Sequence, residues 1–262
     1  MERVLHTFDN GVRVYDDHLL EEQRARYRKR NVHEAEEEDI FVDLIRRLPP
    51  DGCFVDVGAA IGYYLILARK LSPRLAIHAV EPLQRHRVYL RENAALNGLT
   101  SDDFIVHSEG LTSSAGSVTF LDRGFGSRIP RSEKETRVSL STRWKQLLER
   151  IGLRPPKKRS QVLTIPTITL DLLVKRIGSP VDLLQMDVQG LEVEVLKGGE
   201  EAMVAGAVRS FLIGTHGLAI HQECIAQLRA SGYTIEVDQP DTKEQPDGII
   251  VARKVDVATQ AP

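Results

Sequence analysis

The chain has 262 residues, with 35 Lys and Arg against 37 Asp and Glu, a formal charge of −2, and 42% hydrophobic residues. This is the balance of an ordinary globular protein, and no apolar run approaches the roughly 18–20 residues that cross a bilayer. The start lacks a signal peptide, and two cysteines, Cys53 and Cys224, are too few for a disulfide framework. The sequence therefore predicts a cytoplasmic protein with one large core. The near-neutral charge argues weakly against a general nucleic-acid binder.

Residues 1–50 are predicted to form an N-terminal extension made of a hairpin and helices. Two short apolar runs, 4–8 and 12–15, flank Asn10-Gly11, and Asn-Gly is a strong signal for a tight turn. A basic run at residues 24–30 and an acidic run at 34–39 follow, and both are expected to be solvated helix faces with weak ion pairs. Apolar residues at helical spacing then continue until two prolines, at 49 and 50, end the helix.

Residues 51–262 are predicted to form one α/β domain, because short apolar runs alternate with helical segments. Near-continuous apolar runs at 53–57, 75–80, 104–107, 181–186 and 210–213 are typical of buried parallel strands. Helical patterns follow them, beginning with residues 62–71 and 83–97. The last two runs, 233–237 and 248–252, indicate a terminal antiparallel pair. The expected fold is a doubly wound, mainly parallel sheet of the Rossmann-like type.

A basic segment interrupts this alternation at about residues 130–162. Residues 131–159 hold ten Lys and Arg against three Asp and Glu, a local balance of +7, so the rest of the chain carries −9. The segment has a helix-like run at 144–150 but too few apolar residues for its own core, so it is interpreted as an insertion in the domain. Two interpretations stay open: a solvated surface excursion, or a lid whose cations attract an anionic small molecule.

The most informative segment is the loop after the first strand of this domain, Asp-Val-Gly-Ala-Ala-Ile-Gly-Tyr at residues 56–63. A strand enters a small-residue turn and then a helix, so backbone can approach a ligand and helix N–H groups face it. Glu81 ends the next strand, 25 residues after Asp56, where a carboxylate can accept both hydroxyls of a ribose. The candidate cofactor-binding residues are Asp56, Gly58, Ala59, Gly62, Tyr63 and Glu81.

Two cofactors fit these features, a dinucleotide and S-adenosylmethionine. A dinucleotide loop uses three glycines to admit a pyrophosphate, and here the middle one is Ala60. An acid at Asp56 repels a pyrophosphate but suits a ligand that carries an ammonium and a sulfonium. The charge argument favours S-adenosylmethionine, and a dinucleotide oxidoreductase stays the alternative.

These segments resemble the FkbM-type S-adenosylmethionine-dependent methyltransferases. The resemblance covers roughly residues 50–235, and its matching segments are 56–64, 80–82, 163–171 and, most specifically, Met-Asp-Val-Gln-Gly-Leu-Glu at 186–192. The family commonly has Glu where this chain has Gln189. The resemblance implies the class I methyltransferase strand order 3-2-1-4-5-7-6 and O-methylation of a sugar or natural-product hydroxyl. It also implies an adenine site at Ser108 and Glu109.

In this topology the acceptor is expected over the carboxyl ends of the fourth and fifth strands, beside the point where the strand order reverses. Asp187 and Gln189 follow the fourth strand, and His216 follows the fifth. His216 is the candidate general base for a hydroxyl. Asp187 is expected to orient the imidazole, to bind the acceptor or, with His216, to hold a divalent cation. One Asp and one His are too few to establish a metal site, and Gln189 is grouped with the cofactor residues.

Four more residues are candidates for substrate contacts: Glu192, which also supports a helix start, and Asn31, His33 and Glu37 in the N-terminal extension. His221, in the helix after His216, is expected at the surface. The sequence therefore predicts a small-molecule O-methyltransferase. A nucleic-acid or protein methyltransferase and a non-catalytic S-adenosylmethionine-binding module stay open, although the fourth strand lacks the Asn/Asp-Pro-Pro-aromatic motif of amino methylation.

Overall fold

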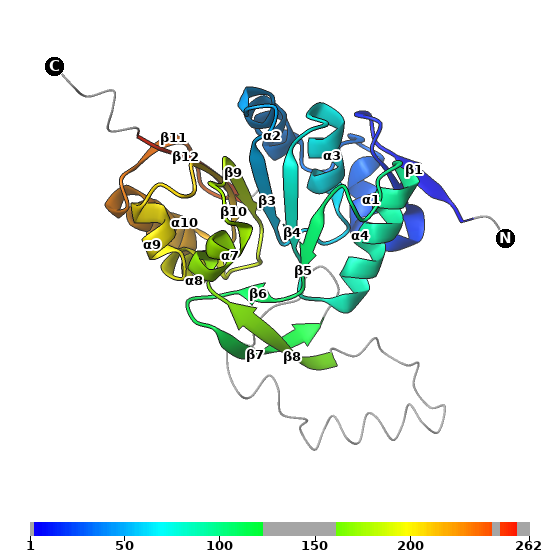
Figure 1. Ribbon diagram of the computed structural model, residues 1–262. Helices are drawn as coiled ribbons and strands as arrows, with labels where there is room; N and C mark the ends of the chain where they lie inside the picture. Colours follow the sequence, from blue (N-terminus) through cyan, green and yellow to red (C-terminus); the bar gives the residue numbers. More distant parts are fainter. Residues whose placement is uncertain (1–2, 123–160, 243–246, 256–262) are drawn as a thin grey trace.

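The computed structural model describes residues 3–122, 161–242 and 247–255 (Figure 1). The basic insertion, with its expected helix at 144–150, lies outside the described residues. Within them, a seven-stranded sheet carries helices on both faces (Figure 1). None of the described helices is long and apolar enough to span a membrane. The division of the chain at residue 50 stays a prediction.

The central sheet has the strand order that the resemblance implies. Across the sheet, the strands are β11 (Tyr233–Gln239), β12 (Gly248–Lys254), β10 (Ser210–Thr215), β9 (Leu183–Met186), β3 (Cys53–Val57), β4 (Ala76–Val80) and β5 (Ile105–His107). Neighbours from β10 to β5 run parallel, whereas β12 is antiparallel to both β10 and β11. Counted from β3, this is the order 3-2-1-4-5-7-6, so the predicted class I methyltransferase fold is confirmed.

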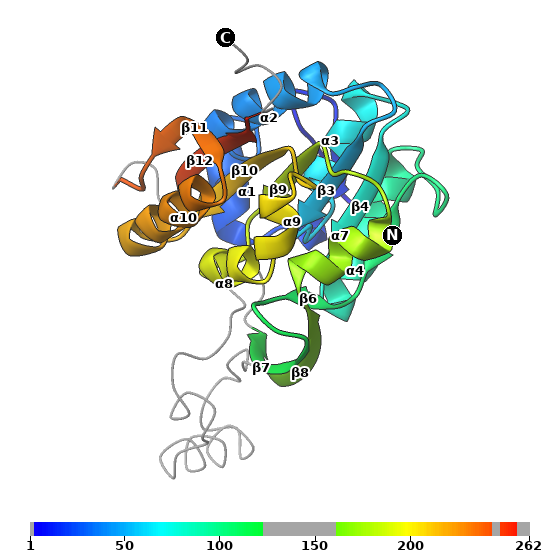
Figure 2. The ribbon, with the colours of Figure 1, turned by 60° about the vertical axis from the view of Figure 1, so that its left-hand side comes forward.

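Two hydrophobic cores lie on opposite faces of this sheet. One face carries α2 (Ala35–Arg47), α3 (Tyr63–Leu71) and α4 (Gln84–Leu96), and the other carries α7 (Leu170–Ile177), α8 (Glu192–Lys197), α9 (Glu200–Val204) and α10 (Leu218–Ala230) (Figure 2). Side chains alternate along a strand, so Phe54 enters the first core and Val55 the second. Cys53 and Cys224 are free and buried, and both belong to the second core.

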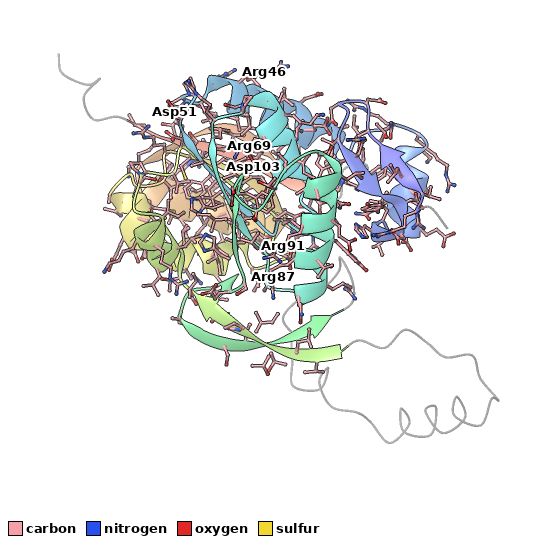
Figure 3. All side chains as sticks on the ribbon, turned by 45° about the vertical axis from the view of Figure 1, so that its right-hand side comes forward. Arg46, Asp51, Arg69, Arg87, Arg91 and Asp103 are labelled. Atoms are coloured by element: carbon pink, nitrogen blue, oxygen red, sulfur yellow. The ribbon has the colours of Figure 1, made fainter. Side chains whose placement is uncertain are left out.

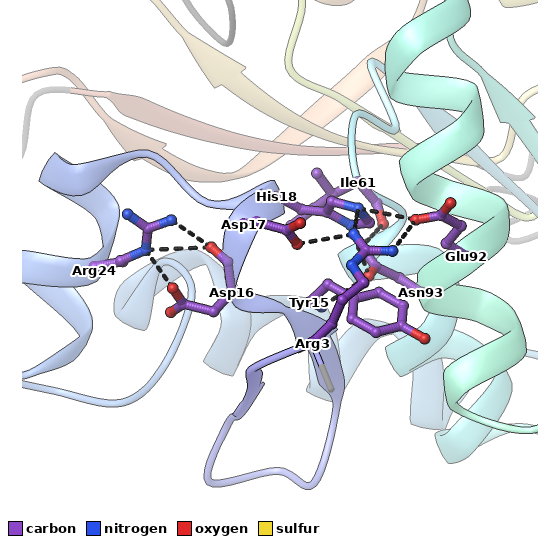
Figure 4. A network of polar contacts seen from close by, with 9 residues as sticks. All are labelled: Arg3, Tyr15, Asp16, Asp17, His18, Arg24, Ile61, Glu92 and Asn93. Atoms are coloured by element: carbon purple, nitrogen blue, oxygen red, sulfur yellow. Dashed lines mark hydrogen bonds and ion pairs between the residues drawn. The ribbon is translucent and has the colours of Figure 1, made fainter. Parts of the chain in front are cut away.

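The N-terminal extension forms the hairpin β1 (Leu5–Thr7) and β2 (Arg13–Tyr15), a 3-10 turn (Asp16–His18) and α1 (Glu21–Tyr27). Figure 4 shows how it is fastened to α4. The wholly buried Asn93 accepts a hydrogen bond from the Tyr15 N–H at 3.1 Å and donates to the Ile61 carbonyl at 3.0 Å. Arg3 bridges Asp17 and Glu92 at 2.8 and 2.7 Å. The extension is therefore held beside the glycine loop that precedes α3.

The acidic run in α2 is not a solvated face throughout, which corrects the sequence expectation. Glu37 and Glu38 are 5% and 6% exposed. Glu37 lies one turn before Phe41 and on the same helix face, so the face that enters the core begins with acids. Each acid has a partner: Gln185 donates to Glu37 at 3.1 Å, and the Tyr63 hydroxyl donates to Glu38 at 2.5 Å.

A second sheet was not predicted. Its three strands, in sheet order, are β6 (Gly110–Leu111), β8 (Gln161–Ile168) and β7 (Gly116–Asp122), and it lies beyond the end of β5 (Figure 1). The strand β8 overlaps the segment 163–171 that carries the family resemblance, and β6 comes shortly after β5 in the chain. This small sheet forms one wall of the cleft described next.

Candidate active site

A cleft of about 380 Å³ lies over the carboxyl ends of β3, β4 and β9. Its walls come from the glycine loop, the N-terminal extension and the small sheet. Its charged and amide side chains, together with two histidines, are Gln23, Arg26, His33, Glu34, Asp56, Glu81, His86, Gln185, Asp187, Gln189 and Asp247. Segments that are far apart in the sequence thus meet in one cavity, at the place where open α/β sheets bind their ligands.

The glycine loop packs so closely against β9 that a side chain at one position has no room. Gly58 has φ +90°, and a Cβ on it would lie 2.0 Å from the Asp187 carbonyl oxygen. Its N–H and that of Ala59 donate to the Val80 carbonyl at 2.9 and 3.2 Å. Ala60 takes up φ +44° without being glycine. The loop therefore brings backbone to the cleft floor, as the sequence pattern predicts.

Asp56 and Gln185 present unpartnered acceptors on the cleft floor. They are paired in register on β3 and β9, and both are 2% exposed. Asp56 Oδ2 and Gln185 Oε1 have no hydrogen-bond partner among the described residues. Burial, with the charges of Glu81 and Asp187, raises the pKa of Asp56 to about 7. Both atoms would be satisfied by a ligand that brings N–H or O–H donors or a positive charge, which fits a ligand with an ammonium.

Glu81 is held by backbone at the end of β4. Its Oε2 accepts from the Ala60 N–H at 3.0 Å, and its Oε1 accepts from the Leu83 N–H at 2.7 Å. Arg87 of α4 donates to the carbonyls of Glu81 and Pro82 at 2.9 and 2.6 Å, and its place on that helix can be followed in Figure 3. A carboxylate has about four lone-pair sites, so acceptor capacity remains for ribose hydroxyls.

Asp187 and Gln189 line the cleft at its other end, and His216 and Glu192, which are not among its lining residues, adjoin them. Nδ1 of His216 lies 2.8 Å from Oε1 of Glu192, which is wholly buried. Its Nε2 lies 2.8 Å from the Gln189 amide and 3.5 Å from Oδ1 of Asp187. Gln189 also donates to Asp187 at 3.0 Å. Glu192 accepts from the Gly190 N–H at the start of α8, in agreement with its helix role, and it also contacts His216, whereas its contact with a substrate stays a prediction.

This end of the cleft is strongly acidic. Burial and the Glu34 charge raise the pKa of Asp187 to about 7. Burial opposes the charge of His216, but the hydrogen bond to Glu192 and the charges of Asp187, Glu192 and Asp247 outweigh it and raise its pKa to about 9. The raised pKa values reflect the gathering of buried carboxylates, whose mutual repulsion a nearby positive charge relieves. A positively charged ligand group is therefore stabilised here.

Some predicted residues lie away from the cleft. Ser108 is exposed, and Glu109 pairs with Arg176 at 2.7 Å; the cleft wall is formed by their neighbours Gly110 and Leu111. Asn31 donates to the Thr7 carbonyl at 2.9 Å and so belongs to the hairpin. Glu37 and Gly62 lie behind the lining residues, and a Cβ on Gly62 would come 2.9 Å from Leu90.

Two other predicted residues line the cleft but have partners elsewhere. His33 contacts the Tyr27 hydroxyl at 2.5 Å, and burial lowers the pKa of His33 to about 3. The Tyr63 hydroxyl points to Glu38 and Asn10. Both side chains therefore hold the N-terminal extension over the cleft.

Sequence reasoning missed Asp247 and misplaced His221. Oδ1 of Asp247 lies 3.3 Å from Nε2 of His216. Tertiary pairing brings Asp247 there, because β12 is antiparallel to β10 and begins opposite its last residue, with Gly248 paired to Thr215. His221 is 1% exposed, with Nδ1 2.8 Å from the Thr215 hydroxyl and Nε2 3.1 Å from Asp238, so its expected surface position is wrong.

Comparison with known proteins agrees with this geometry. The model of the methyltransferase FkbM domain matches residues 56–235. The chain belongs to the FkbM methyltransferase family. The FkbM family resemblance seen in the sequence is thus confirmed, and the protein is an S-adenosylmethionine-dependent methyltransferase.

Relatives of this FkbM methyltransferase differ greatly in length. The methyltransferase sdnD of Sordaria araneosa is 27% identical over 91% of this chain and 97% of its own. The AMB antimetabolite synthetase AmbE of Pseudomonas aeruginosa is 26% identical over 71% of this chain but only 10% of its own. The crystal structure of methyltransferase FkbM from Methylobacillus flagellatus has a TM-score of 0.54 at 15% identity and covers 79% of this chain and 44% of that one. At that identity the likeness concerns the fold.

Proposed function

We propose that the protein transfers the methyl group of S-adenosylmethionine to a hydroxyl of a small molecule, a sugar or a glycosylated natural product. The observation that supports this is the position of Asp187 in the cleft wall at the end opposite Glu81, with Nε2 of His216 3.5 Å from its carboxylate. One end offers acceptors for a cationic nucleoside, and the other offers an imidazole beside a carboxylate. Orientation and removal of a proton are what methyl transfer to oxygen requires from a protein.

The donor end binds the cofactor through three kinds of contact. Glu81 accepts the ribose hydroxyls, and Asp56 and Gln185 face the ammonium with their unpartnered oxygens. Gly58 and Ala59 bring backbone to the nucleoside. When bound, S-adenosylmethionine supplies the electrophilic methyl group and a good leaving group, so the chain itself needs no covalent chemistry.

At the acceptor end, His216 is the proposed base. Its Nδ1–H donates to Glu192 at 2.8 Å, and the acceptor hydroxyl would replace the Gln189 amide, which lies 2.8 Å from the Nε2 lone pair. The acceptor oxygen attacks the methyl carbon, the carbon–sulfur bond breaks, and the hydroxyl proton passes to Nε2. Because the pKa of His216 is raised to about 9, the approach of the cationic donor has to lower it before the imidazole can accept a proton. A divalent cation on Asp187 and His216 would acidify the same hydroxyl.

The described part of the cleft supports an acceptor without a large negative charge. Glu34, Asp187 and Asp247 line the acceptor end, and like charges repel a nucleic-acid phosphate. An anionic acceptor drawn by the basic insertion depends on residues outside the described ranges. The cytoplasmic location expected from the sequence stays part of this proposal.

The test separates donor binding from methyl transfer. Calorimetry should show S-adenosylmethionine binding to the wild type, with His216→Asn within about 2-fold of its affinity. Radiolabelled methyl transfer to a small-molecule extract should fall about 100-fold or more in His216→Asn, as expected for loss of a general base. His221→Asn is the control, because that histidine contacts Thr215 and Asp238 and none of the carboxylates around His216, and it should retain transfer. Absence of donor binding by the wild type overturns the proposal, and label recovered in protein or RNA redirects it to those acceptors.

A further inference from the structure

Two carboxylates at the acceptor end lie at similar distances from one imidazole nitrogen. Nε2 of His216 lies 3.5 Å from Oδ1 of Asp187 and 3.3 Å from Oδ1 of Asp247. A charge-assisted hydrogen bond is shorter, about 2.7–2.9 Å. Two donors that each lie about 2.1 Å from a common ion, at angles of 90–110°, are about 3.0–3.4 Å apart. The 3.3 Å distance falls in this range and the 3.5 Å distance lies just above it, and both are longer than a direct charge-assisted hydrogen bond.

The opposite side of the imidazole is held as in histidine metal sites. Nδ1 lies 2.8 Å from Oε1 of Glu192, and a carboxylate on one ring nitrogen orients the other toward a metal. Glu192 is 0% exposed, and its second oxygen has no partner among the described residues. This buried, incompletely satisfied carboxylate beside His216 is an independent sign that positive charge is missing from the site.

Gln189 completes the set of oxygen donors. Its side-chain amide lies 2.8 Å from Nε2 of His216. The oxygen and nitrogen of an amide exchange places by a 180° rotation, which would turn Oε1 toward the same point. Gln189, Asp187 and Asp247 all line the cleft, so an ion and an acceptor oxygen can reach this point from it.

The charge balance of the cleft favours the same conclusion. Four carboxylates gather here, from Glu34, Asp187, Glu192 and Asp247. Among the described residues that line the cleft, Arg26 is the sole Lys or Arg, and it lies 3.9 Å from Glu34. His216 adds at most one positive charge. A divalent cation would therefore bring the cluster close to neutrality.

We infer that Asp187, Asp247 and Nε2 of His216, with the Gln189 amide oxygen, bind one divalent cation, Mg²⁺ or Mn²⁺. Hard oxygen donors with one imidazole suit these ions. The inference rests on the proposed function of the same cleft and deepens it: the cation binds the acceptor hydroxyl and makes it more acidic. His216 then acts as a ligand, Glu192 acts as the positioning residue that orients it, and the hydroxyl proton passes to the carboxylate of Glu34, which lines the same end of the cleft.

The test is metal binding by the full chain after treatment with EDTA. Mn²⁺ titration, followed by the loss of the free-ion EPR signal and by calorimetry, should reveal one site. Asp187→Asn and Asp247→Asn should each weaken Mn²⁺ binding at least 10-fold. Asp238→Asn is the matched control, because Asp238 contacts the other buried histidine, His221, at 3.1 Å, and it should bind like the wild type. Glu192→Gln should weaken binding about 10-fold, the effect of losing an outer partner.

Two results would overturn the inference. The first is the absence of saturable Mn²⁺ or Mg²⁺ binding at millimolar concentration by a protein that melts cooperatively. The second is an equal metal affinity in Asp187→Asn, Asp247→Asn and the wild type. Donor affinity, measured on the same EDTA-treated sample, separates this failure from failure of the proposed function. If the protein binds the donor but no metal, the inferred cation site is wrong and His216 keeps its proposed role as the base. If the protein binds metal but no donor, the cation site is supported and the proposed function is overturned.

Discussion

The two ends of the cleft are built in different ways. At the donor end, the acids are fixed by backbone that is near in sequence, as when Ala60 and Leu83 donate to Glu81. At the acceptor end, His216 is surrounded by side chains from the ends of β9, from α8 and from the start of β12. Backbone of the first two strand–helix units therefore shapes much of the nucleoside site, whereas the acceptor site depends on side chains from distant parts of the sheet. The first is expected to tolerate little backbone change, and the second is open to change of side chains.

Gly58→Ala should have the largest effect, because this residue touches both ends. The added Cβ would come 2.0 Å from the Asp187 carbonyl oxygen, at a φ of +90° that disfavours a side chain. Steric overlap and backbone strain together should lower the free energy of unfolding by about 3–5 kcal/mol. Urea unfolding measures this change, and donor affinity should fall with it.

Gly98→Ala is the matched control for this change. Gly98 has a similar φ of +83°, but nothing lies within 4 Å of its added Cβ, so the expected loss is about 1 kcal/mol. Equal losses in the two variants would show that the backbone angle alone matters. The close approach of the loop to β9 would then have no energetic importance.

Asp56→Asn should separate stability from binding at the donor end. The pKa of Asp56 is raised from 3.8 to about 7, so between these values the folded chain holds a proton that the unfolded chain has lost. Wild-type stability therefore falls as pH rises through this window and has lost this contribution above about pH 7. Asparagine, which cannot ionise, should add about 1–3 kcal/mol to the free energy of unfolding at pH 8 and close to nothing at pH 4.

Donor affinity should change in the opposite direction. The variant loses the negative charge that faces the donor ammonium, so binding at pH 8 should weaken about 10-fold or more. Stability and donor affinity of the variant are compared with those of the wild type at each pH, so that the effects of Asp187 and Glu37 titration, which both proteins share, cancel. A variant that is less stable at pH 8, or that binds the donor as well as the wild type does, would contradict this assignment.

The same contrast explains what could be predicted from sequence. Strand runs such as 53–57, and a turn that needs glycine at Gly58, are local signals, so the sheet and the donor loop were foreseeable. The pairing of β12 with β10 brings Asp247 to His216, and a polar loop between strands carries no sign of that contact. The burial of Glu37 depends on its contact with Gln185, 148 positions away. An acidic run gives no local sign of which of its members enters the interior.

Glu109→Gln should have the smallest effect and tests where the donor end stops. The resemblance implies an adenine contact at Ser108 and Glu109, but Glu109 pairs with Arg176 at 2.7 Å, and the cleft wall is made by Gly110 and Leu111. If adenine contacts this wall through backbone and apolar surface, removing the charge should change donor affinity less than about 2-fold. The partly exposed ion pair should account for less than about 1 kcal/mol of stability. A 10-fold loss of donor affinity in calorimetry would instead show that the donor site includes this carboxylate. The adenine contact would then depend on a side chain, as the proposed ribose contact depends on Glu81.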